Sequence, residues 1–267
     1  MLFSWLIVLG AIALIGIAKS GFGGGLGLIV VPLCAIGLAP MGYSPEAVLG
    51  LLLPLLMVGD IISVVQYRNE VSWSHIRRLL LPAALGIILG GVLLYILKTQ
   101  SDPKLVASLI RLEIGVESML LVALSWWRVR RGVQVKLLPE PARSISTGLF
   151  AGISSTLAHA AGPIVAMYLL PLNLDRRLFV GTCAFFFFIA NWAKVPVYFQ
   201  AGLFENVEWR FAVYGAPLVL IGAVFGRWMN KRLSDKLFTR IVLWTTFLLG
   251  IYLVIDGTTG VLHRIQD

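Results

Sequence analysis

The chain carries ten apolar stretches separated by short polar turns, and their number and length restrict the fold more than any other feature. Transmembrane helices need about 20 mostly apolar residues. The composition agrees, because 58% of the 267 residues are hydrophobic and 13% are charged, whereas soluble domains contain about 25% charged residues. We therefore expect an all-α polytopic membrane protein embedded in a lipid bilayer. The ten expected segments are Leu2–Ala18, Leu26–Leu38, Pro45–Tyr67, Ile76–Leu97, Leu105–Trp127, Ser144–Leu157, Pro163–Leu172, Arg177–Phe199, Val207–Met229 and Leu237–Ile255.

Two pairs of these segments are too short to be read as ordinary spans. Leu2–Ala18 precedes Leu26–Leu38, and Ser144–Leu157 precedes Pro163–Leu172, with small residues between the members of each pair. Each pair is either two short spans or a re-entrant hairpin of half-helices. Both arrangements place the other loops and the termini on the same sides of the membrane.

The basic residues indicate the orientation in the membrane. Fifteen of the 22 Lys and Arg residues fall in turns on one face, and four fall on the other: Lys98, Lys104, Arg210 and Arg264. Because cytoplasmic loops are enriched in Lys and Arg, we expect the richer face to be cytoplasmic and both termini to lie on the non-cytoplasmic side. The formal net charge of +9 is then loop charge, and we expect no nucleic-acid partner.

The two halves of the sequence resemble each other, with residues 1–132 and 133–267 as the two membrane repeats of one integral domain. Asp60 corresponds to Asn191 and Tyr67 to Tyr198 at an offset of 131, while the sequence around Gly27 matches that around Gly162 at an offset of 135. Gly86-xxx-Gly90 likewise matches Gly222-xxx-Gly226 at an offset of 136. Several such matches in the same order indicate an internal duplication.

The number of crossings makes the proposed repeats inverted. Each half contains an odd number of crossings, whichever way the short pairs are read, so the two halves begin on opposite sides. Inverted repeats with interrupted helices are typical of secondary transporters, in which the substrate lies near the midplane. We expect a transporter rather than a membrane enzyme.

A glycine-rich stretch between the first two segments is the strongest candidate for a binding element. A helix that begins after such a break presents free N–H groups and a positive partial charge, which suits an anion. The second half offers hydroxyl groups, a histidine and Gly162-Pro163 at the equivalent position. The alternative is that the glycines only permit close helix packing. The candidate residues here are Lys19, Ser20, Gly23, Gly24, Gly25, Gly27, Ser155, Thr156, His159 and Gly162.

Two lysines stand well inside the expected membrane segments. A charge at the bilayer centre costs about 2.5–3.5 kcal/mol, so Lys19 and Lys194 should face a cavity or a partner. Two cations favour an anionic substrate, with Asn191 as a neighbouring polar contact. The alternative is that each lysine extends to the membrane surface.

Other polar residues are candidates for proton coupling: Asp60, His159, Glu113 and Glu117. Asp60 and Asn191 are alternatively a structural hydrogen-bonded pair, and Arg111 is alternatively an ion-pair partner of Glu113 or Glu117 that fixes helix packing. His263 is expected in a solvated loop. The sequence has no metal-ligand spacing and no nucleophile–base arrangement, so we expect no catalytic residues, no bound metal and no cofactor.

The stretch from Gly21 to Pro32, together with Pro54, Asp60 and Gly162-Pro163, resembles the TauE/SafE family of sulfite exporters. The second copy departs from the family pattern, because it has His159-Ala160-Ala161-Gly162 where further glycines are usual. The resemblance covers nearly the whole chain. It implies export of sulfite or small organosulfonates such as sulfoacetate across a bacterial inner membrane.

The leading interpretation is a secondary exporter of small sulfur-containing anions that works by alternating access. A passive small-anion channel is the first alternative, and a membrane-embedded enzyme or an assembly factor is a weaker one. The expected partners are a small anionic substrate and the lipid bilayer, and self-association into a homo-oligomer remains open.

Overall fold

The chain folds into α-helices that run side by side. The computed structural model describes residues 2–22, 29–100, 103–131, 139–169, 172, 174–205, 207, 209–230 and 235–266. This part contains ten α-helices, short 3-10 turns and no strand, which confirms the expected all-α fold. The helices are α1 (Leu2–Phe22), α2 (Val30–Leu38), α3 (Pro45–Gln66), α4 (Trp73–Gln100), α5 (Pro103–Arg131), α6 (Glu140–Ala158), α7 (Ala161–Leu169), α8 (Arg176–Gln200), α9 (Trp209–Asn230) and α10 (Asp235–Gln266), with the 3-10 turn η2 (Ala39–Met41) after α2.

Six helices in the described part are long and apolar enough to cross a membrane. They are α1, α3, α4, α8, α9 and α10, over the ranges Phe3–Gly21, Pro45–Gln66, Trp73–Ile96, Arg176–Gln200, Trp209–Met229 and Thr246–His263. Many large apolar side chains on α4 and α9, such as Leu81 and Val224, are exposed on the outside of the bundle. Such a surface requires lipid as its solvent, so the protein is a multi-pass membrane protein.

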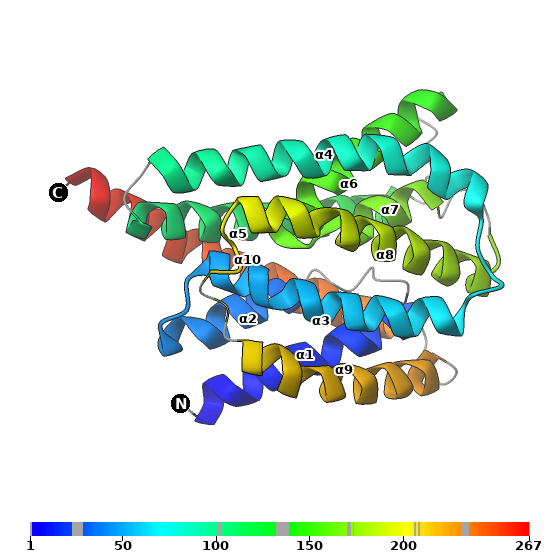
Figure 1. Ribbon diagram of the computed structural model, residues 1–267, viewed down its shortest axis with the longest axis horizontal. Coiled ribbons are helices and arrows are strands. Elements are labelled where there is room, and N and C mark those ends of the chain that lie inside the picture. Colours follow the sequence, from blue (N-terminus) through cyan, green and yellow to red (C-terminus); the bar gives the residue numbers. More distant parts are fainter. Residues whose placement is uncertain are drawn as a thin grey trace.

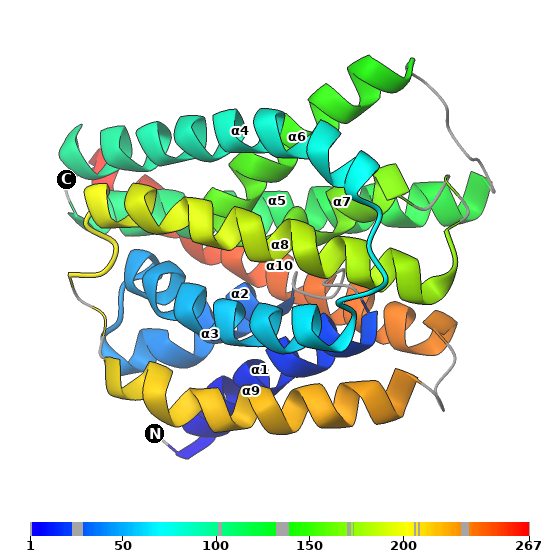
Figure 2. The ribbon, with the colours of Figure 1, turned by 45° about the vertical axis from the view of Figure 1, so that its right-hand side comes forward.

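The long helices lie roughly along the longest axis of the molecule, as Figures 1 and 2 show. The closest pairs are α1 with α9, α4 with α6, and α5 with α10. Helices α3 and α8 contact each other in the middle of the bundle. Both chain termini lie at the same end of the bundle (Figures 1 and 2).

The two short pairs have the arrangement of hairpins. Helix α1 starts at the end that holds the termini, and α2 returns to that end, whereas α6 and α7 both open to the opposite end (Figure 1). Helices α2 and α7 have nine residues each, which gives about 13 Å at 1.5 Å per residue. This length is less than half of the hydrocarbon core of a bilayer, about 30 Å. Helices α2 and α7 are therefore too short to cross a bilayer alone, whereas α1 is among the helices long enough to do so.

Local sequence signals account for several helix starts. Ser44 caps α3 by accepting a hydrogen bond from the Ala47 N–H at 3.3 Å, and Pro45 occupies the first turn. Asp175 caps α8 by accepting from two backbone N–H groups, at 3.0 and 3.1 Å. Side-chain oxygens at this position satisfy N–H groups that lack a helical partner.

Glycines allow the closest helix pairs to approach at backbone distance. A Cβ atom on Gly152 of α6 would lie 2.9 Å from the Gly86 Cα atom and 2.8 Å from the Ile87 backbone nitrogen of α4. A Cβ atom on Gly16 of α1 would lie 2.8 Å from the Gly222 carbonyl carbon of α9. Small residues at such contacts are typical of membrane helices.

This packing predicts that Gly152→Ala destabilises the protein. The added methyl group meets backbone atoms that cannot rotate away, and overpacking of this kind costs about 1–3 kcal/mol. Gly10→Ala on α1 is the matched control, because its Cβ would meet nothing within 4 Å. We expect a lower thermal unfolding midpoint in detergent for Gly152→Ala only, and equal midpoints would contradict the packing argument.

Some expected segment limits were wrong. Helix α10 extends to Gln266 instead of Ile255, so His263 is helical and not in a loop. The additional turns pack against α5, where a Cβ on Gly257 would lie 2.7 Å from the Leu112 nitrogen. Helix α6 begins at Glu140 rather than Ser144, with Pro141 in its first turn, where proline is favoured.

Candidate functional site

The buried charged side chains of the bundle gather where α1, α3, α6 and α8 meet. Asp60 and Lys194 are fully buried, and Lys19 and Asn191 are 7% and 3% exposed. Neither lysine reaches the surface of the bundle. The alternative in which each lysine extends to the membrane surface was therefore wrong for both. Buried charges are stable only when they are paired, and each of these groups has a partner.

Asp60 on α3 joins two other helices. The Lys19 ammonium of α1 donates to Asp60 Oδ1 at 2.5 Å, and Asn191 Nδ2 of α8 donates to Oδ2 at 2.5 Å. The Lys19 ammonium also lies 4.8 Å from the centre of the Phe187 ring. Asp60 and Asn191, which correspond in the two halves of the sequence, therefore contact each other directly.

Lys194 is held one turn further along α8 by a different set of groups. Its ammonium donates to the Ser155 carbonyl oxygen at 3.0 Å and lies 2.8 Å from His159 Nδ1. Its distance to the centre of the Tyr198 ring is 5.8 Å. The last carbonyl groups of a helix carry a negative partial charge, so the end of α6 stabilises this cation.

The contacts of His159 define its neutral tautomer. Its Nε2 atom lies 3.1 Å from the Leu49 carbonyl oxygen, which only accepts hydrogen bonds, so Nε2 carries the proton. Nδ1 is then the acceptor for the Lys194 ammonium. His159 has a φ of 51° and follows the last residue of α6. This left-handed conformation turns the chain between α6 and α7.

In each half of the chain, a tyrosine hydroxyl donates a hydrogen bond to a carbonyl group near the end of the helix that precedes α2 or α7. The Tyr67 hydroxyl donates to the Ser20 carbonyl oxygen near the end of α1 at 3.0 Å. The Tyr198 hydroxyl donates to the Thr156 carbonyl oxygen near the end of α6 at 2.7 Å. Each tyrosine thus fixes the end of the first helix in its own hairpin.

The interruption predicted in the second half is present beside this network. Helix α1 ends at Phe22 and α2 begins at Val30, while Gly23, Gly24, Gly25 and Gly27 lie outside the described residues. Helix α6 ends at Ala158 and α7 begins at Ala161, with Gly162 buried in the first turn of α7.

The hydroxyl groups of this region mostly bind backbone or each other. Ser20 Oγ lies 3.4 Å from Ser63 Oγ, and Thr156 Oγ1 donates to the Gly152 carbonyl at 2.9 Å. Ser155 contributes its carbonyl oxygen to Lys194. Each buried charged group of this region thus has a partner: Lys19 and Asp60 pair with each other, and Lys194 binds a carbonyl oxygen and a neutral imidazole.

Two glutamates lie at the side of the network rather than within it. Glu113 and Glu117 are on α5, which also contacts α6. Glu117 Oε2 and Ser154 Oγ are buried atoms with no hydrogen-bond partner among the described residues. Unsatisfied buried oxygens of this kind require an explanation. Arg111 pairs with Asp256 of α10 at 2.6 Å, so the alternative in which Arg111 pairs with Glu113 or Glu117 was wrong.

Several groups of this site were missed by the sequence reasoning. The carbonyl oxygens of Leu49, Ser155 and Thr156 have no side-chain signature. Asp256, which lies outside this site, does have one, because it is the only carboxylate between Asp235 and Asp267 in the sequence.

A bundle of apolar helices around a buried ionic network defines a multi-pass membrane protein with a polar centre. The chain matches the family model described as sulfite exporter TauE/SafE over residues 8–253. The protein therefore belongs to the TauE/SafE sulfite exporter family, a family of transporters. No match to the chain was found among curated proteins or among solved structures.

Proposed function

We propose that the protein is a secondary exporter that moves sulfite or small organosulfonates, such as sulfoacetate, across a bacterial inner membrane by alternating access. The observation that carries this proposal is the ionic network that joins both helix breaks through α3 and α8. Buried ionisable residues inside membrane proteins mark substrate and ion pathways.

The charge of the network fits a monovalent anion. With both ammonium groups protonated, Lys19 and Lys194 contribute two positive charges and Asp60 one negative charge, and the contacts of His159 are those of a neutral ring. The net charge of this cluster is therefore +1. A sulfonate or hydrogen sulfite ion would neutralise it. Lys19 is already paired with Asp60, so we assign the main anion contact to Lys194.

Substrate binding would rearrange the contacts of Lys194. The ammonium now binds a carbonyl oxygen and a neutral imidazole, and an anion would replace one of them with a charged partner. We assign further hydrogen bonds to the substrate to Ser20, Ser155, Thr156, Asn191 and the start of α7 at Gly162. We assign the same role to Gly23, Gly24, Gly25 and Gly27.

Proton coupling is assigned to Asp60 and His159, with Glu113 and Glu117 as the outer carboxylates of a relay. If the hydrogen bond between the Lys194 ammonium and His159 Nδ1 broke, Nδ1 would be free to accept a proton. Glu117 Oε2 is a buried carboxylate oxygen with no hydrogen-bond partner among the described residues, as a proton-accepting group of such a relay would require.

Alternating access is supported by the contacts of the two proposed repeats, residues 1–132 and 133–267. The pairing of α1 with α9 has its counterpart in the pairing of α6 with α4, and α3 meets α8 as α5 meets α10. The equivalent Tyr67 and Tyr198 hydrogen bonds agree with the same relation. Hairpins that open to opposite ends suit inverted repeats, and we place the termini on the non-cytoplasmic side.

Counterflow in proteoliposomes tests this function. Vesicles preloaded with unlabelled sulfite should take up labelled sulfite faster than empty vesicles, with an initial rate that saturates. An imposed pH gradient should change that rate. A passive channel would give flux without saturation or dependence on the pH gradient. An enzyme or assembly factor would give no flux, and either result would contradict the proposal.

A further inference from the structure

A cavity of about 650 Å³ lies at the end of the bundle that holds both termini, away from the ionic network. We call it the terminal cavity. Its volume falls in the range of about 300–1,000 Å³ that is usual for small-molecule sites. The polar residues that the argument uses are Ser44, Lys104, Ser108, Arg111, Asp256 and His263.

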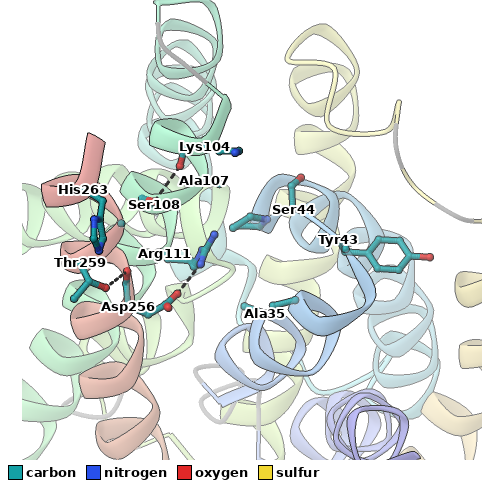
Figure 3. Close-up of a pocket in the computed structure, with 14 residues that line it drawn as sticks. Ala35, Tyr43, Ser44, Lys104, Ala107, Ser108, Arg111, Asp256, Thr259 and His263 are labelled. Carbon is teal, nitrogen blue, oxygen red and sulfur yellow. Dashed lines mark hydrogen bonds and ion pairs between the residues drawn. The ribbon is translucent and has the colours of Figure 1, made fainter. Parts of the chain in front are cut away.

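Two helix faces form one side of the terminal cavity. Lys104, Ser108 and Arg111 follow one another on one face of α5, at spacings of four and three residues. Asp256 and His263, seven residues apart, lie on one face of α10. Figure 3 shows Arg111 between α10 and the turn that carries Ser44 at the start of α3.

The guanidinium of Arg111 is the main donor that faces this space. Its Nη1 atom donates to Asp256 Oδ2 at 2.6 Å, and the two side chains are 31% and 37% exposed. A guanidinium has five N–H donors, so this contact leaves donors that face the cavity. The Ser108 hydroxyl donates to the Lys104 carbonyl at 2.9 Å and therefore serves the backbone.

The charged groups that line the terminal cavity are mainly positive. Lys104 and Arg111 oppose a single carboxylate, Asp256, among the residues that line the cavity. Planar guanidinium groups bind carboxylates and similar oxyanions through paired hydrogen bonds. A small oxyanion therefore fits both the charge and the donors.

We propose that the terminal cavity is a second binding site for a small soluble oxyanion of the sulfonate or sulfite type, anchored by Arg111. In the absence of the anion, the Asp256 carboxylate binds the Arg111 guanidinium, and the anion competes with this carboxylate for the same donors. The choice of anion class rests on the proposed function, whereas the site itself rests on the cavity and the Arg111–Asp256 pair. Exchange of one anionic partner for another makes binding weak and rapidly reversible, as an entry or exit site requires.

A cysteine reporter tests this site separately from the ionic network. Ala107→Cys places a thiol in the lining of the terminal cavity, and the native Cys34 and Cys183 are buried. Methanesulfonate should slow maleimide labelling of this thiol in the purified chain, compared with chloride at equal ionic strength. Asp256→Asn should lower the methanesulfonate concentration that gives half of the maximal protection by about tenfold, because the competing charged hydrogen bond is removed. We call this concentration the half-protection concentration. Arg111→Gln should abolish protection.

Matched variants separate this result from general effects. Ser74→Cys, at the opposite end of the bundle, should not be protected. Glu70→Gln, which removes the carboxylate of the exposed Arg177–Glu70 pair, should leave half-protection unchanged. Lys194→Met should stop transport and leave protection intact, so failure of the proposed function and failure of the terminal cavity are distinguishable.

The proposal is overturned if methanesulfonate and chloride protect equally, or if Arg111→Gln keeps protection. If Arg111→Gln does not fold, an unchanged half-protection concentration in Asp256→Asn overturns it alone. A lipid phosphate is the other source of an oxyanion. Protection in phosphatidylglycerol nanodiscs, absent in phosphatidylcholine and not increased by methanesulfonate, would assign the cavity to lipid and also overturn it.

Discussion

Asp60→Asn is expected to lower the free energy of unfolding by about 3–5 kcal/mol, the cost of removing one member of a buried ion pair. The Lys19 ammonium would remain in the interior, 7% exposed, without its counter-charge. Asparagine has nearly the shape of aspartate, so the loss would arise from charge and not from a cavity. Steric trapping in lipid bicelles measures this free energy.

Glu70→Gln is the matched control for this substitution. It also converts an ion-paired carboxylate to an amide, but the Arg177–Glu70 pair is exposed, with side chains that are 68% and 28% accessible. Exposed pairs contribute about 0–1 kcal/mol. If Asp60→Asn costs no more than Glu70→Gln, the network does not stabilise the fold in the way we describe.

A double variant separates stability from transport. Replacement of a buried ion pair by apolar side chains is often neutral or stabilising, so Lys19→Met with Asp60→Leu should regain much of the stability lost in Asp60→Asn. Transport should not return, because the proposed coupling carboxylate is absent.

The sequence predicted which residues form the centre but not how they connect. Asp60 and Asn191 were paired by their offset in the duplication, and their contact at 2.5 Å follows if each lies near the axis that relates the halves. Lys19 and Lys194 were selected because charge inside an apolar segment is costly. The interruption at Gly162 was predicted from the small residues and proline around it, and the adjacent break between α6 and α7 has that position.

What the sequence did not predict depends on backbone geometry and on distant helices. Lys194 binds a carbonyl that is available because α6 ends at Ala158, and carbonyl groups are the same at every residue. The partner of Arg111 lies 145 residues away on α10, whereas the sequence reasoning considered only neighbours on the same helix. The end of α10 was placed too early, because its polar last turns are stabilised by packing on α5 rather than by hydrophobicity.

Lys194→Met is expected to reduce sulfite counterflow at least about 100-fold with little loss of folded protein. Two opposite charges about 4 Å apart at an effective dielectric constant of about 20 attract by about 4 kcal/mol, which corresponds to roughly a thousandfold in affinity. Methionine fills a similar volume. It leaves the Ser155 carbonyl with its bond from the His159 N–H at 3.2 Å, so the end of α6 keeps a partner.

Arg177→Met is the matched control, because it removes a cation from the same helix while breaking only an exposed pair with Glu70. It should retain most of the parental counterflow rate. Labelled sulfite uptake into preloaded proteoliposomes gives the rates, and thermal unfolding midpoints in detergent show whether each variant is folded. Lys194 supplies the excess positive charge of the network. If Lys194→Met is folded and transports at the rate of Arg177→Met, the anion must bind somewhere other than the junction of α6 and α8.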